Sequence, residues 1–382
     1  MKIGILTGTR PDIIKMAPLY WEARRRKLDV VLIHTGQHWS SDLFAGVYSD
    51  LNLPEPAFKC GYSDPKSPAD SVSQMIGSLD KLLRSELTDL DILLTHGDTL
   101  TAMAGSLAAH LDLIAVGHVE AGLRTFSREP FPEQTDTRCS DACSDLFFAA
   151  TETNKRNLLN EGFDEKRIFV VGNTVVDAAK WAAKKGGESQ AFFEKLGIDF
   201  SKQQVYFSCH RRENTMHESR FKAMVDALAQ ASDSGYQVLW SVRPGTQRAI
   251  DEYGLESEIS EHENLLPVAH IPNYTDMMFY MSRCRMVVTD SGSMQEESAA
   301  LHVPCVTLRF VTDRPESVEA GVNILAPPKD AATITRSIQE CEKNNDEMRR
   351  KPNPYGEGDS SQRILDAIGK FQGRFIEWEH SK

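Results

Sequence analysis

Short runs of apolar residues alternate along the chain with longer stretches in which apolar residues recur every three or four positions. In the first half the short runs predict strands at 2–6, 30–34, 91–95, 113–118, 146–150 and 168–171. The longer stretches predict helices at 12–26, 67–86 and 99–111. This alternation is typical of a parallel sheet covered by helices.

The second half of the chain repeats the pattern. Its apolar runs predict strands at 205–208, 237–242, 264–268, 285–289 and 305–308. A mostly helical segment at 173–197 separates the two sets, and a Pro- and Gly-rich break precedes a last predicted helix at 361–371. We therefore expect an α/β protein with domains at 1–172 and 173–358, and a terminal segment at 359–382 that packs back on the first domain.

Composition and charge exclude several classes of protein. The 382 residues are 41% hydrophobic, and the net charge of −12 argues against a broad surface for nucleic acid or acidic lipid. The seven Cys residues lack paired CxxC spacing and are odd in number, which argues against a disulfide framework. The first apolar run is too short for a signal peptide, and no run reads as a membrane span. We expect a cytoplasmic protein that binds neither membrane nor nucleic acid.

The turn after the first predicted strand differs from the usual cofactor fingerprints. It reads Gly8-Thr-Arg-Pro rather than GxGxxG, and the chain has no Walker A sequence. The usual sequence evidence for binding a nicotinamide cofactor or ATP is therefore missing. The turn places Arg10 and Lys15 near a helix N-terminus, which favours anions. The alternative is a capped turn with solvated cations.

The strand predicted at 285–289 is followed by small polar residues and a helix start. Ser291, Gly292 and Ser293 would let phosphate oxygens approach backbone N–H groups, which is the design of a diphosphate cradle. Glu297, one turn further on, could accept both hydroxyl hydrogens of a ribose or could be an exposed helix carboxylate. Without further context, such a turn could also simply cap the helix.

Carboxylates follow the strands of the first domain. Asp98, Glu120 and Glu133 come from three different loops and could converge for acid–base chemistry on a small substrate. Metal binding by His96, His118, Asp98 and Glu120 is an alternative, but HxD and HxE lack the spacing of an HExxH site, so we expect no metal. Helix caps and salt bridges are the structural alternative.

A second basic set follows the first strand of the second domain. His210 and Arg211 could neutralise or protonate a diphosphate leaving group, although an arginine here could also pair with Glu213. Arg314 adds a cation on a later loop. Cys209 beside His210 is disfavoured as a nucleophile, because consecutive residues of a strand point to opposite faces.

Together these motifs resemble the non-hydrolysing UDP-N-acetylglucosamine 2-epimerase family. The resemblance rests, in chain order, on Gly8 to Pro18, Gly36 to His38, His96 to Asp98, His118 to Arg124, Gly172 to Asp177, His210 to Glu213, Asp290 to Gly292, Gln295 to Glu297 and Arg314 to Glu316. It implies two Rossmann-like domains in a glycosyltransferase-B-like arrangement with an interdomain active-site cleft. It also implies a homodimer without metal or nicotinamide cofactor.

The resemblance further implies a reaction and its residues. UDP would be eliminated across C1 and C2 to give 2-acetamidoglucal, and would add again after a proton returns to the opposite face of C2. The catalytic set it implies is Asp98, Glu120, Glu133 and His210, with the base among the carboxylates left open. The substrate-binding set is Arg10, Lys15, Arg211, Ser291, Gly292, Ser293, Glu297 and Arg314.

The chain also departs from the family pattern. A second Glu and an Asn-Arg pair are common after the position of Glu133, whereas this chain has Gln134, Asp136-Thr137 and then Arg138. Trp39 and the segment 63–66 stand where bacterial members carry Gln- and Arg-bearing segments that bind a second, activating substrate molecule. We therefore expect no such activation.

Several related functions stay open at this stage. The same epimerisation on a modified sugar, such as a diacetamido-uronate, is a close alternative, and a hydrolysing relative would release free sugar. An inverting glycosyltransferase would share the fold and the UDP cradle but needs an acceptor and usually one base. A non-catalytic UDP-sugar-binding regulator is disfavoured because all three motif carboxylates are present.

Overall fold

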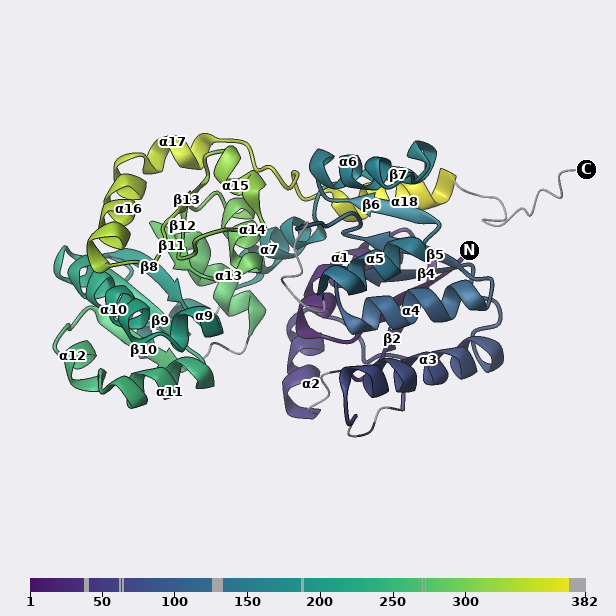
Figure 1. Ribbon diagram of the computed structural model, residues 1–382, viewed down its shortest axis with the longest axis horizontal. Helices are drawn as coiled ribbons and strands as arrows, with labels where there is room; N and C mark the ends of the chain where they lie inside the picture. The colour runs from purple at the N-terminus through teal and green to yellow at the C-terminus, as the bar shows by residue number, and fades with distance from the viewer. Residues whose placement is uncertain are drawn as a thin grey trace, which may run out of the picture. The chain divides into compact units, whose positions relative to one another are not determined.

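The structure, a computed structural model, divides the chain into two units (Figure 1). It describes residues 1–37, 41–61, 63, 65–125, 133–186, 189–269, 271 and 273–370. The first unit comprises Met1–Ala178 and the chain from Gly356 onward, and the second comprises Ala179–Tyr355. Each unit contains its own sheet.

The sheet of the first unit has seven strands within the described residues, and all its strand pairs are parallel. The strands are β1 (Lys2–Thr7), β2 (Asp29–His34), β3 (Phe58–Lys59), β4 (Ile92–His96), β5 (Ala115–Val119), β6 (Leu146–Ala149) and β7 (Ile168–Val170). Their order across the sheet is β3-β2-β1-β4-β5-β6-β7. The direction of the chain across the sheet therefore reverses between β1 and β4.

Helices cover this sheet. They are α1 (Arg10–Arg25), α2 (Ser41–Asp50), α3 (Pro68–Ser85), α4 (Leu100–Leu111), α5 (Glu133–Ala142), α6 (Glu152–Asn160), the short 3₁₀ helix η1 (Glu165–Arg167), α7 (Thr174–Lys185), which runs across the unit boundary, and α18 (Ser360–Lys370). Figure 1 shows α3 and α4 side by side. Their apolar faces, which include Leu79, Leu83 and Ala109, share one buried cluster with Leu6 and Leu93 of the sheet.

The C-terminal helix α18 belongs to the first unit. Its buried face includes Ile364 and Ile368. Arg26, at the end of α1, donates from Nη1 to Asp366 Oδ1 at 2.6 Å. Asp177 of α7 accepts the backbone N–H groups of Ser360 and Ser361, the first residues of α18. The N-terminus of α18 is thereby held by a carboxylate, which complements the helix dipole.

The second unit has six parallel strands within the described residues. They are β8 (Gln203–Ser208), β9 (Tyr236–Val242), β10 (Leu265–Ala269), β11 (Met286–Thr289), β12 (Cys305–Thr307) and β13 (Asn323–Leu325). The order is β10-β9-β8-β11-β12-β13, so the reversal here falls between β8 and β11. This is the doubly wound order of Rossmann-like sheets.

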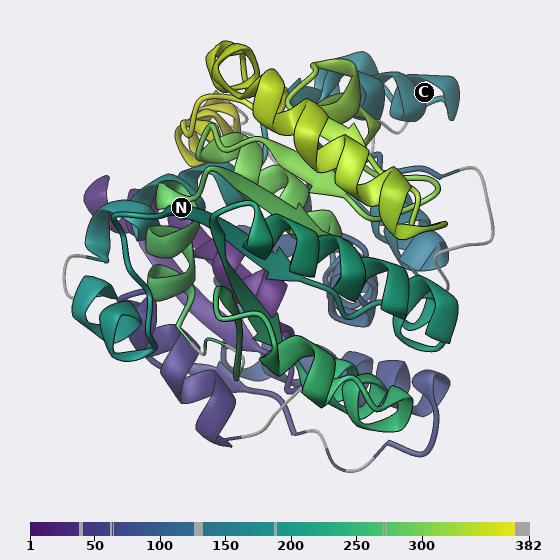
Figure 2. The same ribbon diagram turned by 90° about the vertical axis from the view of Figure 1, so that its left-hand side faces the viewer.

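The helices of the second unit pack on both faces of that sheet. Besides part of α7 they are α8 (Ser189–Lys195), α9 (Arg212–Thr215), α10 (Glu218–Asp233), α11 (Pro244–Tyr253), α12 (Glu256–Ser260), α13 (Tyr274–Arg283), α14 (Gly292–Ala300), α15 (Pro315–Glu319), α16 (Ala331–Lys343) and α17 (Asn345–Arg350). In Figures 1 and 2, α10 and α16 run side by side. Phe221, Leu228 and Ile338 from these helices join Phe207 and Trp240 of the sheet in one buried cluster.

The structure confirms the predicted α/β class with two Rossmann-like sheets. The predicted strands and helices recur with small shifts at their ends, and two short strands, β3 and β13, were not predicted. The strand predicted from residue 113 begins only at Ala115, because Leu113 adopts a left-handed conformation, φ +58°, in the turn after α4. Residue 371, the last of the predicted terminal helix, lies outside the described residues. Among those described, no helix is long and apolar enough to cross a membrane.

Candidate functional site

Several predicted site residues follow strands at the switch point of each sheet. Where the strand order reverses, loops from neighbouring parallel strands leave in opposite directions, and the carboxyl ends of those strands are the usual place for a ligand. In the first unit these loops carry Arg10 after β1 and Asp98 after β4. In the second unit they carry His210 after β8 and Ser291 after β11. Each unit thus presents one half of the predicted set.

Beside the first switch point, four charged side chains form a buried cluster: Asp12, Lys15, His96 and Glu120. Lys15 Nζ lies 2.8 Å from Glu120 Oε1, and His96 Nε2 lies 2.8 Å from Glu120 Oε2. His96 Nδ1 lies 3.1 Å from Asp12 Oδ1. Asn173 donates from Nδ2 to Glu120 Oε1 at 2.7 Å. Both oxygens of Glu120 therefore face a cationic group.

Two members of this cluster, His96 and Glu120, differ from their ordinary states. Burial opposes the charge of His96, but its contacts with Asp12 and Glu120 outweigh burial and raise the pKa of His96 to about 9. Glu120 has φ +67°, a left-handed conformation that side chains other than glycine seldom adopt. Strained backbone of this kind concentrates at functional sites, and it costs about 1–3 kcal/mol. The contacts with Lys15, His96 and Asn173 hold the Glu120 side chain in place.

The turn into α1 is already filled by a carboxylate of the chain itself. Thr9 caps the helix, and Asp12 Oδ2 accepts the backbone N–H groups of Thr9 at 2.9 Å and Gly8 at 3.2 Å. A Cβ atom at Gly8 would collide with the Thr101 hydroxyl, so the turn requires glycine. The alternative of solvated cations is wrong for Lys15, which is buried, whereas Arg10 opens α1 and is half-buried.

The other two predicted carboxylates, Asp98 and Glu133, lie near Asp136, which was not predicted as a site residue. Glu133 opens α5, and its Oε2 is buried with no hydrogen-bond partner among the described residues. Asp136, one turn later, is 2% exposed. Burial, together with the charges of Asp98 and Glu133, raises the pKa of Asp136 to about 7. Asp136 therefore lies within range of the charges of Asp98 and Glu133.

The alternative of a metal centre at these strand ends is not supported by the geometry. His118 donates Nε2–H to the carbonyl of Gly97 at 2.8 Å, and its Nδ1 lies 2.7 Å from Asp141 Oδ1. Neither ring nitrogen is left for a metal ion. Across the described part of the chain, no group of three or more His, Cys, Asp or Glu side chains is arranged to hold one.

In the second unit, the predicted diphosphate cradle lies at the N-terminus of α14. Ser291 is the N-cap residue, but its side chain makes no capping hydrogen bond, and its Oγ lies 3.3 Å from Ser293 Oγ. Gly292 carries no side chain over this end of the helix. The first-turn N–H groups are therefore not capped by Ser291, which suits an anion such as phosphate.

Three arginines gather near this helix start around Asp313. Arg309 Nη1 lies 2.7 Å, Arg211 Nη2 3.9 Å and Arg314 Nη1 4.0 Å from the Asp313 carboxylate. Burial opposes the charge of this carboxylate, but the arginines outweigh burial and lower the pKa of Asp313 to about 2. A Cβ atom on Gly292 would lie 3.5 Å from both Asp313 oxygens. The start of α14 is therefore a cationic environment, and Arg309 was missing from the predicted set.

The carboxylates along α14 are buried. Glu296 accepts a hydrogen bond from Arg314 Nε at 2.6 Å, which orients that guanidinium. Glu297 is 4% exposed, so the alternative of an exposed helix carboxylate is wrong. Gln295 Oε1 accepts from Thr312 Oγ1 at 2.7 Å and so ties the loop before Arg314 to α14.

His210 and Arg211 lie on the segment that leaves β8. The His210 side chain is 28% exposed, and Arg211 donates from Nε to the carbonyl of Asp290 at 2.9 Å. The Arg211 guanidinium also lies 3.5 Å from Glu213, as the structural alternative anticipated. Cys209 is fully buried, and burial raises the pKa of its thiol well above the usual range. A nucleophilic role for Cys209 is therefore disfavoured.

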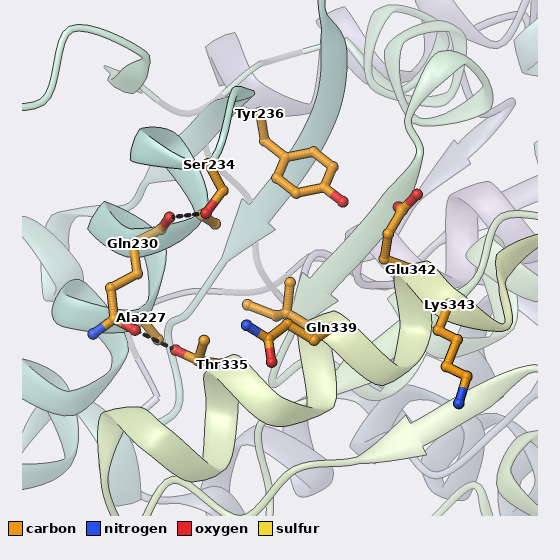
Figure 3. A pocket seen from close by; sticks show the side chains of 10 residues that line it. Ala227, Gln230, Ser234, Tyr236, Thr335, Gln339, Glu342 and Lys343 are labelled. Carbon is orange, nitrogen blue, oxygen red and sulfur yellow. Dashed lines mark hydrogen bonds between the residues drawn. The ribbon is translucent and has the colours of Figure 1, made fainter.

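A cavity of about 370 Å³ lies elsewhere in the second unit, between α10 and α16 (Figure 3). Its wall includes Ala227, Ala231 and Ile338, and it contains none of the predicted site residues. Gln230 and Thr335 across it are hydrogen-bonded to each other at 2.9 Å. It brings together neither the cations nor the carboxylates that the predicted chemistry requires.

Some residues that shape the site were not recognised from the sequence. Asp12 stands three positions after Thr9, and this capping-box spacing could have identified it. No local signal identifies Asn173 as a partner of Glu120, or Arg309 and Asp290 as partners of the second-unit residues. Trp39 and residue 64 lie outside the described residues, so the expected lack of activation by a second substrate molecule stays a prediction.

Comparisons with known proteins cover nearly the whole chain. Residues 22–369 match the family model described as UDP-N-acetylglucosamine 2-epimerase. A UDP-N-acetylglucosamine 2-epimerase of Methanococcus maripaludis is 35% identical over 373 residues, which cover 96% of this chain and 98% of the relative. That of Methanocaldococcus jannaschii is 34% identical over 371 residues, with coverage of 96% and 98%. The crystal structure of the latter enzyme in complex with UDP-GlcNAc and UDP aligns at a TM-score of 0.81 and 33% identity, covering 97% of this chain and 100% of that one.

Proposed function

Because the chain belongs to the UDP-N-acetylglucosamine 2-epimerase family, we propose that it interconverts UDP-N-acetylglucosamine and UDP-N-acetylmannosamine by inverting C2 of the sugar. The observation that carries the proposal is full-length similarity to a relative whose crystal structure holds UDP-GlcNAc and UDP. Arg10 and Asp98 in the first unit, and His210 and Ser291 in the second, follow strands at the switch point of their sheet, which supports the assignment. We further propose that the product supplies the synthesis of surface polysaccharide or other glycans.

The chemistry demands a strongly stabilised leaving group. The C2 proton is not next to a carbonyl, so a base cannot remove it unless the C1–O bond breaks as well. The electron pair of that bond leaves with UDP, the C2 proton moves to a carboxylate, and a C1=C2 double bond forms. Addition of UDP to C1, with a proton delivered to the opposite face of C2, completes the inversion. Stabilising charge on the departing diphosphate is therefore the main task of the protein.

The second unit supplies groups for this task. The N-terminus of α14 offers N–H groups that Ser291 leaves uncapped, and Arg211 and Arg314 lie beside it. His210 is positioned on the adjacent loop and can donate to a phosphate oxygen. The predicted contact of Glu297 with the ribose is consistent with its burial along the same helix.

The first unit supplies the acid–base carboxylates. Glu120 is held in place by Lys15 Nζ and His96 Nε2, each at 2.8 Å from a carboxylate oxygen. Asp98 and Glu133 lie with Asp136, whose pKa is near the working range of a proton carrier. We therefore assign proton transfer at C2 to Asp98 and Glu133, with Glu120 as a fixed negative charge facing the developing positive charge on the sugar ring.

Incubation with UDP-N-acetylglucosamine alone in D₂O, followed by NMR, tests the function. Deuterium at C2 with accumulation of the manno epimer is the expected result. Release of UDP and free sugar would identify a hydrolysing enzyme instead, and no exchange without an added acceptor would favour a glycosyltransferase. The Asp98→Asn variant serves as the control for exchange that does not come from the site. The homodimer and the cytoplasmic location stay predictions.

A further inference from the structure

Asp290 is a buried residue whose carboxylate accepts several hydrogen bonds from the segment that carries His210. It directly follows β11, which pairs with β8 in the middle of the second sheet, and it is 0% exposed. Its Oδ2 accepts the backbone N–H of Arg211 at 3.0 Å and Asn214 Nδ2 at 3.0 Å. Its Oδ1 accepts the backbone N–H of His210 at 3.1 Å. These contacts fix the first residues after β8 in one conformation.

The backbone of Asp290 strengthens this attachment. Its N–H donates to the carbonyl of Ser208 at 3.3 Å, and its own carbonyl accepts from Arg211 Nε at 2.9 Å. Asn214 also donates to the carbonyl of Leu308 at 3.1 Å, so the ends of β8, β11 and β12 are joined around one side chain. The Arg211 side chain thus donates to the backbone carbonyl of Asp290, whereas the Asp290 carboxylate accepts from backbone N–H groups and from Asn214.

The imidazole of His210 lies at ion-pair distance from that carboxylate. His210 Nδ1 lies 3.4 Å from Asp290 Oδ1, and it is a buried nitrogen without a hydrogen-bond partner within the described ranges. A buried carboxylate is costly unless a charge or several N–H groups compensate it. A proton on Nδ1 would compensate Asp290 and leave Nε2 directed away from it. Which ring nitrogen carries the proton is set by the partner of the other nitrogen.

We propose that Asp290 is a positioning residue for His210: it fixes the loop and the ring so that Nδ1 keeps a proton and Nε2 is presented to the diphosphate of the substrate. The role of the diphosphate rests on the proposed function, whereas the relation between Asp290 and His210 stands on the geometry alone. In the acyl-transfer enzymes with an Asp–His pair, a buried Asp orients the imidazole and stabilises its charged form in the same way.

The charges around His210 determine the pH dependence that follows. Burial lowers the pKa of His210, and Asp290 raises it. Arg243 and Arg211 lower the pKa, and Glu213, on α9, raises it. Asp290 is the largest charge that favours the imidazolium, so Asp290→Asn should move the loss of activity at rising pH to lower pH. It should also lower kcat by roughly 10-fold or more, because an oriented donor to the leaving group is lost.

The test compares Asp290→Asn, His210→Gln and the double variant. We expect Asp290→Asn to lower kcat with a smaller effect on UDP affinity, to shift the alkaline limb of the kcat profile, and to add nothing to His210→Gln. The proposal would be overturned if the losses of kcat in the two single variants multiplied in the double variant. It would also be overturned if the alkaline limb of the kcat profile did not shift in Asp290→Asn. Asp177→Asn is the matched control: Asp177 is also a buried carboxylate that accepts backbone N–H groups, but none of the described histidines lies at ion-pair distance from it. It should lower stability without shifting the profile.

A measurement on the wild-type protein keeps the proposal testable if Asp290→Asn does not fold. ¹⁵N NMR of labelled histidine in the UDP-bound protein, with the His210 signals assigned by their absence in His210→Gln, reports the protonated nitrogen. We expect Nδ1 to be protonated in both charge states, and a neutral ring protonated on Nε2 would contradict the proposal. If the wild type shows no C2 exchange, the proposed function fails, while this tautomer still decides the relation between Asp290 and His210.

Discussion

Lys15 Nζ lies 2.8 Å from Glu120 Oε1, and the two side chains are only 6% and 4% exposed. The sequence predicted Lys15 as a substrate-binding cation, and in this structure its ammonium group neutralises a carboxylate of the same site. Two charges removed from water stabilise a fold only when they stay paired. The chemistry of Glu120 and the stability of the first unit therefore depend on the same contact.

We predict that Lys15→Met destabilises the first unit by about 3 kcal/mol, because it leaves Glu120 buried with less positive charge around it. For a unit of this size that corresponds to a fall in Tm of roughly 6–12 °C. Thermal unfolding followed by circular dichroism measures it. Lys222→Met is the matched control: Lys222 pairs with Glu218 at 2.7 Å on the surface of α10, and its loss should change Tm little. Equal effects of the two changes would contradict the prediction.

His96 should make stability depend on pH in the alkaline range. The pKa of His96 in the folded state is about 9, above the ordinary 6.5, so the native state binds the proton more tightly than the unfolded state. Its stabilisation is complete below pH 6.5 and is lost as the pH rises through about 9. The full difference amounts to about 3 kcal/mol. Urea unfolding of wild type and His96→Gln across this range should show curves that converge at high pH, and a gap independent of pH would refute the assignment.

Asp136 should also make stability fall as the pH rises, but in a lower pH range. Its folded-state pKa is raised from 3.8 to about 7, so stability is lost as the pH rises between these values. Asp136→Asn keeps the size of the side chain but cannot ionise. We expect the variant to be more stable than wild type above pH 7, by roughly 4 kcal/mol at most.

A matched carboxylate distinguishes this effect from a general response to lost charge. Asp70 accepts the backbone N–H of Lys66 at 2.8 Å, and this hydrogen bond lowers the pKa of Asp70. Asp70→Asn should therefore reduce stability at neutral pH, opposite in sign to Asp136→Asn. Chemical unfolding at several pH values measures both, and a stabilising Asp70→Asn would remove the basis of the comparison.

The fold was predictable because its signals are local. Apolar runs and helical periods follow from contacts within a few residues, so the main strands and helices could be placed. The strands β3 and β13 were not predicted because two or three residues are too few to show an apolar periodicity. The start of β5 was misplaced because the apolar run includes Leu113, whose left-handed φ depends on the turn after α4. The family resemblance, drawn from motifs, is confirmed by the comparisons.

The sequence allowed us to predict where site residues lie in the fold, but not which side chains they contact. Residues after parallel strands meet at one edge of a sheet, which is why Asp98 and Ser291 could be placed at switch points. The partners of Glu120 could not be inferred, because Lys15 is 105 and Asn173 is 53 positions away in the chain. Likewise, the departure at Asp136 was visible in the sequence, but its raised pKa depends on burial and on Asp98 in another loop.

The two units should fail in different ways when single site residues change. Asp98→Asn keeps the shape of the side chain but removes a proton acceptor, so turnover should fall by about 10²-fold or more while UDP affinity is nearly unchanged. Ser291→Ala removes a hydroxyl at the start of α14, so UDP should bind with a loss of about 2 kcal/mol, near 30-fold, from a lost hydrogen bond to a charged group. Calorimetric titration with UDP and the D₂O exchange rate measure both variants. A large loss of UDP affinity in Asp98→Asn would withdraw that residue from proton transfer, because a group that acts only at C2 should not affect binding of the free nucleotide.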